Sequence, residues 1–371
     1  MAEKIVLAGG GTAGHVNPLL ATAQVLRERG YDVEIIGTQE GLESTLVPEA
    51  GFPLLILPKV PVPRRPTPEL FSVPARLREA TRRADAHLRG ARVLVGFGGY
   101  VSAPAYIAAK RAGIPFIVQE QNVRPGWANR LGARNASAVS LAFPQTRLWA
   151  QKGPTVFTGL PLRRSIEDLA ARRRDPEQAR RARVEAARTF GLDPDLPTLL
   201  VTGGSLGAQH LNEVVTEAAP LFGGRAQILH ATGKGKAEAV IAAAEQSETN
   251  WQVREYLDNM EEALAAADLV LCRSGAGTVA ELGALGLPAF YVPLPIGNGE
   301  QRRNAEQQVA AGGARLVEDR DFDARTVEEE VLPLLLNPSA LQSMGEAIRS
   351  TSPGNGSELL ADLVEAEVGQ R

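Results

Sequence analysis

Three short glycine-rich turns in the sequence could bind a phosphate group. They are GGGTAG at residues 9–14, GGSLG at 203–207 and SGAGT at 274–278, and each follows a run of apolar residues and precedes a helical pattern. Such turns bring backbone N–H groups to a helix N-terminus, where the helix dipole favours negative charge. One such turn is weak evidence, since glycine also serves tight turns. Three of them predict a ligand with a pyrophosphate group, held between two domains beyond the carboxyl ends of the strands.

Two polar side chains near the third turn could bind the hydroxyls of a sugar. Glu281 lies one helical turn beyond the glycines, where a carboxylate could accept hydrogen bonds from both hydroxyls of a ribose. Gln301 shares a helix face with Asn304, three residues further along. The alternative for each of them is an ordinary polar surface.

The first turn also matches the dinucleotide fingerprint G-x-G-x-x-G at Gly9, Gly11 and Gly14. That fingerprint requires an acid at the end of the second strand to bind the ribose. Here that strand ends in Gly37-Thr38, and an ionisable ring, His15, follows the last glycine. An NAD-dependent oxidoreductase is therefore an alternative, but a disfavoured one.

The sequence contains little that could bind a metal ion. Two D-x-D patterns overlap at residues 319–323, and such patterns bind metal in some sugar-nucleotide enzymes. We expect Asp323 to cap the following helix instead, and we predict no obligatory metal and no other cofactor. The single cysteine, Cys272, lies in an apolar run and is expected to be a buried small side chain.

The apolar runs and helical patterns around these turns alternate along the chain. Residues 5–8 form a continuous apolar run typical of a strand buried on both faces, and residues 33–36 form the next one. Asn17-Pro18 predicts the N-cap and first residue of the helix between them. The alternation continues to residue 122 and restarts at residue 198. We therefore expect an α/β chain with two domains in tandem.

The composition agrees with a two-domain enzyme. The chain has 371 residues, of which 44% are hydrophobic and 22% charged, and at roughly 150 residues per domain this length predicts two or three domains. A net charge of −3 excludes a globally basic nucleic-acid binder, and one cysteine excludes a disulfide scaffold. No apolar run approaches the ~18–20 residues of a membrane-spanning helix.

One segment departs from this neutral average. Residues 59–92 contain nine Lys or Arg and three Asp or Glu. Thr67-Pro68 predicts a helix start, after which apolar and basic residues alternate. The apolar members are Leu70, Phe71, Val73 and Leu77, and the basic members are Arg76, Arg78, Arg82 and Arg83. Such a helix could bind an anionic membrane surface, or it could be a core-facing helix with a solvated arginine face.

Taken together, the motifs resemble a known family. GGGTAGHVNP (9–18), GFGGYVSAP (96–104), QEQN (119–122), VTGGSLGAQHLN (201–212), CRSGAGTVAE (272–281) and EQRRNA (300–305) are similar to those of the MurG family. The resemblance implies the glycosyltransferase-B fold, in which two Rossmann-like domains have parallel sheets that face a cleft. It also implies transfer of N-acetylglucosamine from UDP-N-acetylglucosamine to the 4-hydroxyl of undecaprenyl-pyrophosphoryl-N-acetylmuramyl-pentapeptide, with inversion. The expected location is peripheral, at the cytoplasmic face of the cell membrane.

The restart of the pattern at residue 198 and the charged segment before it give a domain plan, and the resemblance implies the role of each domain. Residues 1–162 would form the acceptor- and membrane-facing domain and residues 198–350 the UDP-sugar-binding domain, with a linker at 163–197. A C-terminal helix within 351–371 could pack back on the first domain.

It also implies which residues bind substrate. The implied set is Thr12, Ala13, Gly14, Asn122, Arg163, Ser205, Leu257, Ala276, Gly277, Thr278, Val279, Ala280, Glu281 and Gln301. Arg163 and Ser205 would contact the pyrophosphate, Leu257 the uracil and Glu281 the ribose. His15 is the first choice for the general base, since its unperturbed pKa of ~6.5 suits neutral pH, and Glu120 is the second.

The chain departs from the family pattern at four positions. Ala13 replaces a frequent glycine, Gln119 a histidine and Leu160 an asparagine, and Glu300 stands where an amide or a histidine is common. These changes leave open which peptide stem the acceptor carries. A transferase acting on another glycolipid and a non-catalytic UDP-sugar-binding protein are further alternatives.

Overall fold

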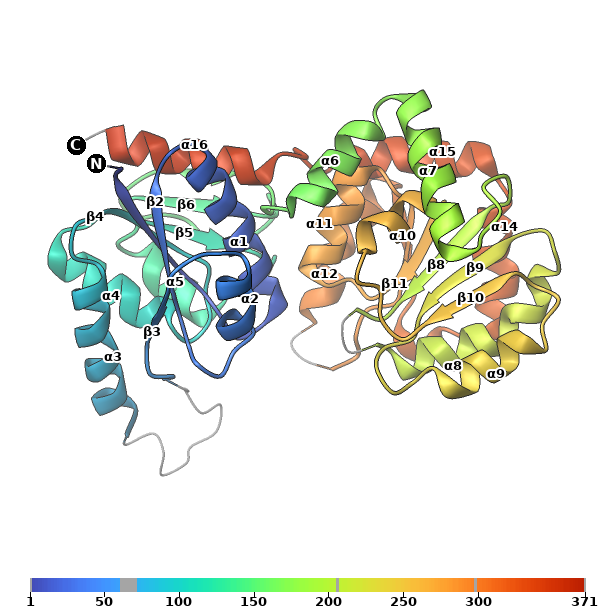
Figure 1. The fold of residues 1–371 in the computed structure, drawn as a ribbon, viewed down its shortest axis with the longest axis horizontal. Coiled ribbons are helices and arrows are strands. Elements are labelled where there is room, and N and C mark those ends of the chain that lie inside the picture. Colours follow the sequence, from blue (N-terminus) through green and yellow to red (C-terminus); the bar gives the residue numbers. More distant parts are fainter. Residues whose placement is uncertain (1, 61–71, 205–206, 297–298, 370–371) are drawn as a thin grey trace. The chain divides into compact units, whose positions relative to one another are not determined.

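The chain forms two compact units in a computed structural model that describes residues 2–60, 72–204, 207–296 and 299–369 (Figure 1). Unit 1 comprises Met1–Arg163 and Asn355–Arg371, and unit 2 comprises Arg164–Gly354. Each unit is built on one parallel β-sheet flanked by helices (Figure 1). The fold is thus α/β with two Rossmann-like units, as the sequence predicts.

Unit 1 has a seven-stranded sheet in the order β3-β2-β1-β4-β5-β6-β7. Its elements are β1 (Lys4–Ala8), α1 (Ala13–Glu28), β2 (Asp32–Gly37), α2 (Glu43–Glu49), β3 (Leu54–Ile56), α3 (Val73–His87), β4 (Ala91–Gly96), α4 (Ser102–Ala112), β5 (Phe116–Glu120), α5 (Trp127–Ala133), β6 (Ala138–Leu141), β7 (Thr155–Phe157) and α16 (Gly356–Gly369).

Unit 2 has a six-stranded sheet in the order β10-β9-β8-β11-β12-β13. Its elements before the third turn are α6 (Arg164–Arg172), α7 (Pro176–Phe190), β8 (Thr198–Thr202), α8 (Gln209–Ala218), η2 (Ala219–Phe222), β9 (Gln227–Ala231), α9 (Glu238–Glu245), β10 (Trp251–Arg254), α10 (Met260–Ala266) and β11 (Leu269–Cys272). After it come α11 (Ala276–Leu285), β12 (Ala289–Tyr291), α12 (Glu300–Ala310), β13 (Ala314–Leu316), η3 (Asp319–Asp321), α13 (Ala324–Thr326), η4 (Val327–Val331), α14 (Leu332–Leu335) and α15 (Pro338–Arg349).

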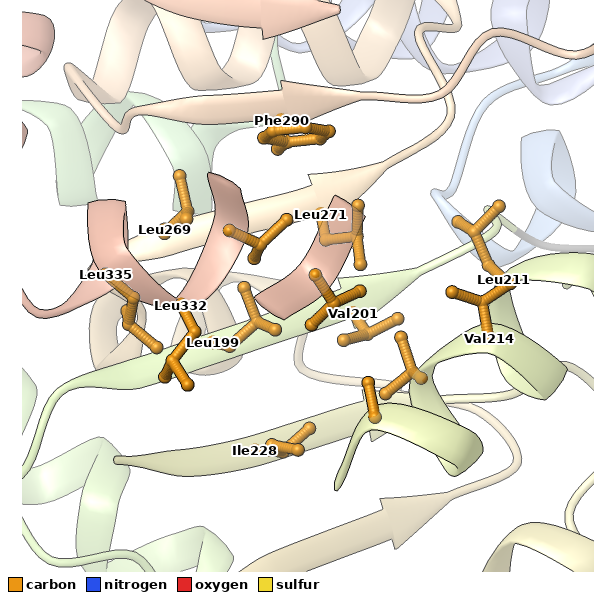
Figure 2. Close-up of a cluster of buried hydrophobic side chains, with 14 of the residues drawn as sticks. Leu199, Val201, Leu211, Val214, Ile228, Leu269, Leu271, Phe290, Leu332 and Leu335 are labelled. Atoms are coloured by element: carbon orange, nitrogen blue, oxygen red, sulfur yellow. The ribbon is translucent and has the colours of Figure 1, made fainter. Parts of the chain in front are cut away.

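The central strands are buried on both faces, which explains why they are continuous apolar runs. In β1, Ile5 and Leu7 belong to one core cluster of unit 1, and Val6 and Ala8 belong to another. Successive side chains of a strand point to opposite faces, so these are the cores above and below the sheet. Figure 2 shows the corresponding packing in unit 2, where side chains of β8, β9, β11 and β12 meet leucines of α8 and α14.

The last helix of the chain belongs to the first unit. Leu360 and Val364 of α16 are fully buried in the core cluster that also contains Leu19 and Leu26 of α1. At the end of α1, Arg29 forms ion pairs with three acids of α16, Glu358, Asp362 and Glu365. Figure 1 shows α16, in red, beside α1.

The first helix starts one turn earlier than the sequence predicts. Asn17-Pro18 was expected to begin it, but α1 begins at Ala13, after Thr12 in an extended conformation (φ −129°, ψ 157°). Pro18 lies inside the helix, where its missing N–H costs one hydrogen bond near the N-terminus. The prediction was wrong because it took Pro18 as the first residue of the helix, although Ala13 and Gly14 before it are already helical. The consequence is that His15 lies in the first turn of a helix.

The segment expected to link the two domains, residues 163–197, contains α6 and α7. Ile166 and Leu169 of α6 are buried, and so is Phe190 at the end of α7. These two helices contact α10 and α11, so they are part of unit 2. None of the helices in the described part of the chain is both long and apolar enough to span a membrane.

We expect Leu360→Ala to destabilise unit 1, because it leaves a cavity in a core that the first helix shares with the last. Large-to-small changes of this kind cost about 2–5 kcal/mol. Hydrogen–deuterium exchange of the full chain should show faster exchange in β1, β2 and β4, with unit 2 unchanged. The control is Ile241→Ala on α9, whose side chain is 41% exposed. Unaltered exchange in unit 1 would contradict the placement of α16.

Candidate active site

The glycine turns lie at equivalent places in the two sheets. In unit 1, β1 pairs with β4, and Ala8 lies opposite Gly96 at their carboxyl ends. In unit 2, β8 pairs with β11, and Thr202 lies opposite Cys272. In both sheets the strand order reverses at these pairs, and open α/β sheets bind ligands at such switch points. Each unit therefore has a candidate ligand site where two turns meet.

In unit 1 this site is formed around His15. The Thr12 hydroxyl lies 2.9 Å from Nδ1 of His15. The other side of the ring faces Gly98 in the turn after β4, where a Cβ atom would lie 3.2 Å from Cδ2 and from Nε2. Gly98 also has φ +90°, which favours glycine. The ring is thus held between the start of α1 and the neighbouring turn.

The environment of His15 shifts its pKa in two opposing ways. Burial lowers the pKa, and the carboxylate of Glu43 raises it, with burial the larger effect. The pKa therefore lies below the ordinary value of 6.5. A histidine of this kind is neutral at pH 7 and can accept a proton.

Glu120, the second candidate for the base, is buried at the end of β5 and is 1% exposed. Its carboxylate accepts hydrogen bonds from the N–H groups of Asn122 and Gly126, both 3.0 Å away, and from Nδ2 of Asn129 at 2.9 Å. Burial raises its pKa, and these hydrogen bonds partly oppose the effect. The Tyr106 hydroxyl donates to Oδ1 of the same Asn129. Glu120 thus holds the loop after β5.

Sequence reasoning missed two side chains of this site. Asn129 links Glu120 to the region of Gly98, where a Cβ would lie 3.4 Å from its Nδ2. Glu43 is fully buried beneath the first glycine turn and accepts a hydrogen bond from the Gly11 N–H. The sequence signal for Glu43 is the group of glycines around it, Gly10, Gly37 and Gly41. A side chain at any of these positions would overlap the Glu43 side chain.

In unit 2 the third turn leads directly into α11. Gly275 is the N-cap, in extended conformation, and the first turn of the helix contains no acid. Ser274, fully buried just before it, has no hydrogen-bond partner for its Oγ atom among the described residues. The predicted binding residues Ala276, Gly277, Thr278, Val279, Ala280 and Glu281 all lie on α11. The N-terminus of α11 is therefore suited to an anion.

Glu281 is half-buried in the second turn of α11. Its charge, after burial, is one of the causes that raise the pKa of Cys272. Cys272 itself is 1% exposed in β11, which confirms its expected role as a buried small side chain. The carboxylate of Glu281 therefore lies close to the carboxyl end of that strand.

The acidic segment after β13 connects two of the turns of unit 2. Asp323 caps α13 by accepting a hydrogen bond from Thr326 N–H at 2.8 Å, which confirms its predicted capping role. Asp319 forms an ion pair with the buried Arg273, and it lies 3.4 Å from Nδ1 of His210 at the start of α8. The partners of Asp319 thus lie next to the second and third glycine turns, a connection that the sequence did not reveal.

The other predicted binding residues lie on neighbouring loops. Leu257 is buried after β10, and Gln301, in the first turn of α12, accepts a hydrogen bond from Leu294 N–H at 2.9 Å. Both follow carboxyl ends of strands in the sheet of unit 2. Asn122 and Arg163 are half-buried in unit 1, and Ser205 lies outside the described residues.

The basic segment of unit 1 is described only in part. Leu70, Phe71 and the predicted helix start Thr67-Pro68 lie outside the described residues. In α3, Ala80 and Ala84 are buried, and Val73 and Leu77 are half-buried. The exposed side chains on α3 include the four predicted arginines, Arg76, Arg78, Arg82 and Arg83. Arg82 and Arg83 both pair with Glu79.

Comparison with known families matches both units. Residues 5–141 match the glycosyltransferase family 28 N-terminal domain, and residues 198–359 match the family 28 C-terminal domain. The chain is 50% identical over 366 residues to a protein of a Nocardioides strain, with 97% of each chain covered. It is 49% identical over 378 residues to a protein of Frankia casuarinae, covering 100% of this chain and 98% of the other. Both are named UDP-N-acetylglucosamine--N-acetylmuramyl-(pentapeptide) pyrophosphoryl-undecaprenol N-acetylglucosamine transferase.

Solved structures show the same fold. The crystal structure of Acinetobacter baumannii MurG is similar to the whole chain, with a TM-score of 0.78, 28% identity and coverage of 98% of this chain and 99% of the other. The UDP-GlcNAc 2-epimerase of Neisseria meningitidis has a TM-score of 0.69 at 14% identity, covering 98% and 100%, which is a likeness of fold alone.

We expect His15 to titrate below pH 6.5 in the folded protein, because burial disfavours the charged ring. The measurement is an NMR pH titration of the His15 Cε1 proton, assigned by its disappearance in His15→Gln. The same titration in denaturant provides the reference value. A folded-state pKa equal to or above that reference would contradict the environment described for the ring.

Proposed function

The chain belongs to glycosyltransferase family 28, and we infer that it is the N-acetylglucosaminyltransferase for which its relatives are named. It transfers N-acetylglucosamine from UDP-N-acetylglucosamine to the 4-hydroxyl of lipid-linked N-acetylmuramyl-pentapeptide, with inversion of the anomeric centre. The observation that carries this inference is the 50% identity over 366 residues, which covers both units. Through this product the enzyme would serve cell-wall synthesis, cell shape and division.

Unit 2 is the unit that we assign to the nucleotide sugar. The N-terminus of α11 has no acid in its first turn, and the buried Oγ of Ser274 beside it has no partner among the described residues. A pyrophosphate oxygen can accept hydrogen bonds from such a terminus. Glu281, one turn further along α11, is placed to accept the hydroxyls of the ribose. Gln301 we assign to the sugar and Leu257 to the uracil.

Unit 1 carries the proposed general base, His15. A base must have a nitrogen with a free lone pair, and Nδ1 of His15 is engaged with Thr12. If Nδ1–H donates to the Thr12 hydroxyl, Nε2 carries the lone pair and can accept the proton of the 4-hydroxyl. The pKa of His15, lowered mainly by burial, keeps the ring neutral and ready to do so.

Glu120 is less suited to this step. Its carboxylate is 1% exposed and already accepts two hydrogen bonds from the loop after β5 and one from Asn129 of α5. We therefore assign Glu120 to holding Asn122 and Asn129. The negative charge of the departing UDP would be met by Arg163 and by the helix N-terminus of α11.

The experiment is UDP release from UDP-N-acetylglucosamine, measured with and without the lipid-linked acceptor. We expect release only with the acceptor, and a product that contains the disaccharide. In His15→Gln the kcat should fall about 10²–10⁴-fold, the usual contribution of a general base, with the donor KM little changed. His87→Gln is the matched control, because His87 is a half-buried histidine of α3 outside the proposed site. Full turnover in His15→Gln would remove His15 from the role.

We also propose that α3 binds an anionic membrane surface. Arg76, Arg78, Arg82 and Arg83 are exposed on it, and the acceptor that we infer is anchored in lipid. Cations near such a surface contribute about 1 kcal/mol each. The Glu79 carboxylate pairs with Arg82 and Arg83 and offsets part of that attraction.

Liposome flotation tests this binding. Changing the four arginines of α3 to glutamate should reduce the bound fraction on vesicles with anionic lipid at least about tenfold, because the attraction becomes repulsion. The control makes the same change to glutamate at four exposed arginines of unit 2: Arg180, Arg181, Arg320 and Arg325. Equal flotation of the α3 variant and the control would argue against α3 as the membrane contact.

A further inference from the structure

Glu43 is a buried carboxylate that the mechanism above does not use. It is the first residue of α2, and its exposed fraction is 0%. Its Oε2 atom accepts the Gly11 N–H at 2.8 Å, and its Oε1 atom accepts the N–H and the hydroxyl of Thr38 at 2.9 and 2.7 Å. A buried charge is retained only where hydrogen bonds replace its lost water. Burial alone would raise the pKa of Glu43, but these hydrogen bonds hold it below the ordinary value.

The surrounding backbone is shaped to the Glu43 side chain. A Cβ atom at Gly10 would lie 2.3 Å from Oε1, and one at Gly41 would lie 2.1 Å from Oε2. At Gly37 a Cβ would lie 2.5 Å from the Cγ atom of Glu43. Three glycines on three sides therefore make room for this carboxylate, which indicates a built site for one negative charge.

The Glu43 carboxylate occupies a position that an anionic ligand takes in other glycine turns. A phosphate at such a turn accepts hydrogen bonds from backbone N–H groups at a helix N-terminus. Here Gly11, with φ +95°, donates its N–H to Glu43, and α1 begins two residues later. The carboxylate beneath the turn would also repel a pyrophosphate. The first turn therefore differs from the N-terminus of α11, although both are rich in glycine.

Glu43 is connected to His15 through the chain. Gly11, which Glu43 holds, precedes Thr12, whose hydroxyl contacts Nδ1 of His15. The Glu43 charge also acts on the His15 ring and raises its pKa against the effect of burial.

Other charged groups on the elements packed against α1 lie elsewhere. Lys4 of β1 pairs with Glu34 of β2, and Asp32 is exposed at the start of β2. Glu49, at the end of α2, is exposed. On α16, Arg29 forms ion pairs with Glu358, Asp362 and Glu365 beyond the last residue of α1. Glu367 follows these acids on the same helix.

We propose that Glu43 is a positioning residue for the transfer reaction. It serves as an internal anion that fixes the first glycine turn, so that Thr12 and His15 are presented to the acceptor hydroxyl. This inference rests on the proposed role of His15 as the base. On this proposal, the first turn binds an uncharged part of the acceptor, its sugar hydroxyl. The N–H of Gly11 binds no pyrophosphate, because it donates to Glu43.

The first test compares Glu43→Gln with Glu49→Gln, which makes the same change at an exposed position of the same helix. A carboxamide has one oxygen, so its NH₂ group would face either the Gly11 N–H or the donors of Thr38, and the turn would be released. We expect kcat to fall about tenfold or more, because small misplacements of a catalytic group have large effects on rate. The donor KM should stay within about twofold, since unit 2 is unchanged.

The pH profile separates positioning from simple loss of structure. The Glu43 charge raises the pKa of His15, so its removal lowers that pKa. The acid limb of the kcat profile should therefore move to lower pH in Glu43→Gln. In Glu43→Asp the charge remains but the reach is shorter, so kcat should fall while the limb stays near its wild-type position. A lowered kcat with no shift of the limb in Glu43→Gln would leave Glu43 a structural role only and overturn the proposal.

An NMR titration of His15 in the free protein gives a readout that needs no substrate. We expect a lower His15 pKa in Glu43→Gln than in the wild type, and no change in Glu49→Gln. If the wild-type protein makes no product but this shift is seen, the proposed function fails while the coupling of Glu43 to His15 stands. An unchanged His15 pKa together with wild-type kcat in Glu43→Gln would overturn the inference.

Discussion

The site in each unit depends on one constraint, the burial of a parallel sheet on both faces. The interior residues of β1 and β8 are apolar because helices cover both sides of these strands, and parallel strands end at the same edge. The reversal of strand order beside β1 and β8 leaves two turns next to each other at that edge. The candidate site residues therefore lie at that edge. At the other strand ends, the crossover connections cover the edge of the sheet.

The two units use this geometry with different electrostatics. In unit 1, Glu43 puts a negative charge beneath the glycine turn and takes up the N–H of Gly11. In unit 2, the N-terminus of α11 has no acid in its first turn, and Asp319 forms an ion pair with Arg273. Similar glycine content thus gives one turn that carries its own anion and one suited to receive an anion. This difference supports the proposed base in the first unit and the proposed nucleotide in the second.

Much of this arrangement was predictable from the chain alone. The apolar runs predicted the central strands because a strand buried on both faces is composed mainly of apolar residues. The burial of Cys272 and the capping by Asp323 followed from local pattern, since each depends on neighbours close in sequence. The start of α1 was placed wrongly, because a proline near a helix start can lie before or within the first turns.

The sequence by itself determined two α/β units, the order of their turns and the family, since these depend on periodicity and on motifs within short stretches. Only the tertiary structure decided what each turn contains. Glu43 reaches Gly11 across 32 positions, and Asp319 connects residues beside two turns far from it in the chain. The tertiary structure also decided that Glu120 holds the loop after β5 and that Nδ1 of His15 contacts the Thr12 hydroxyl. Such facts depend on which side chains meet across a sheet edge, and no local pattern records that.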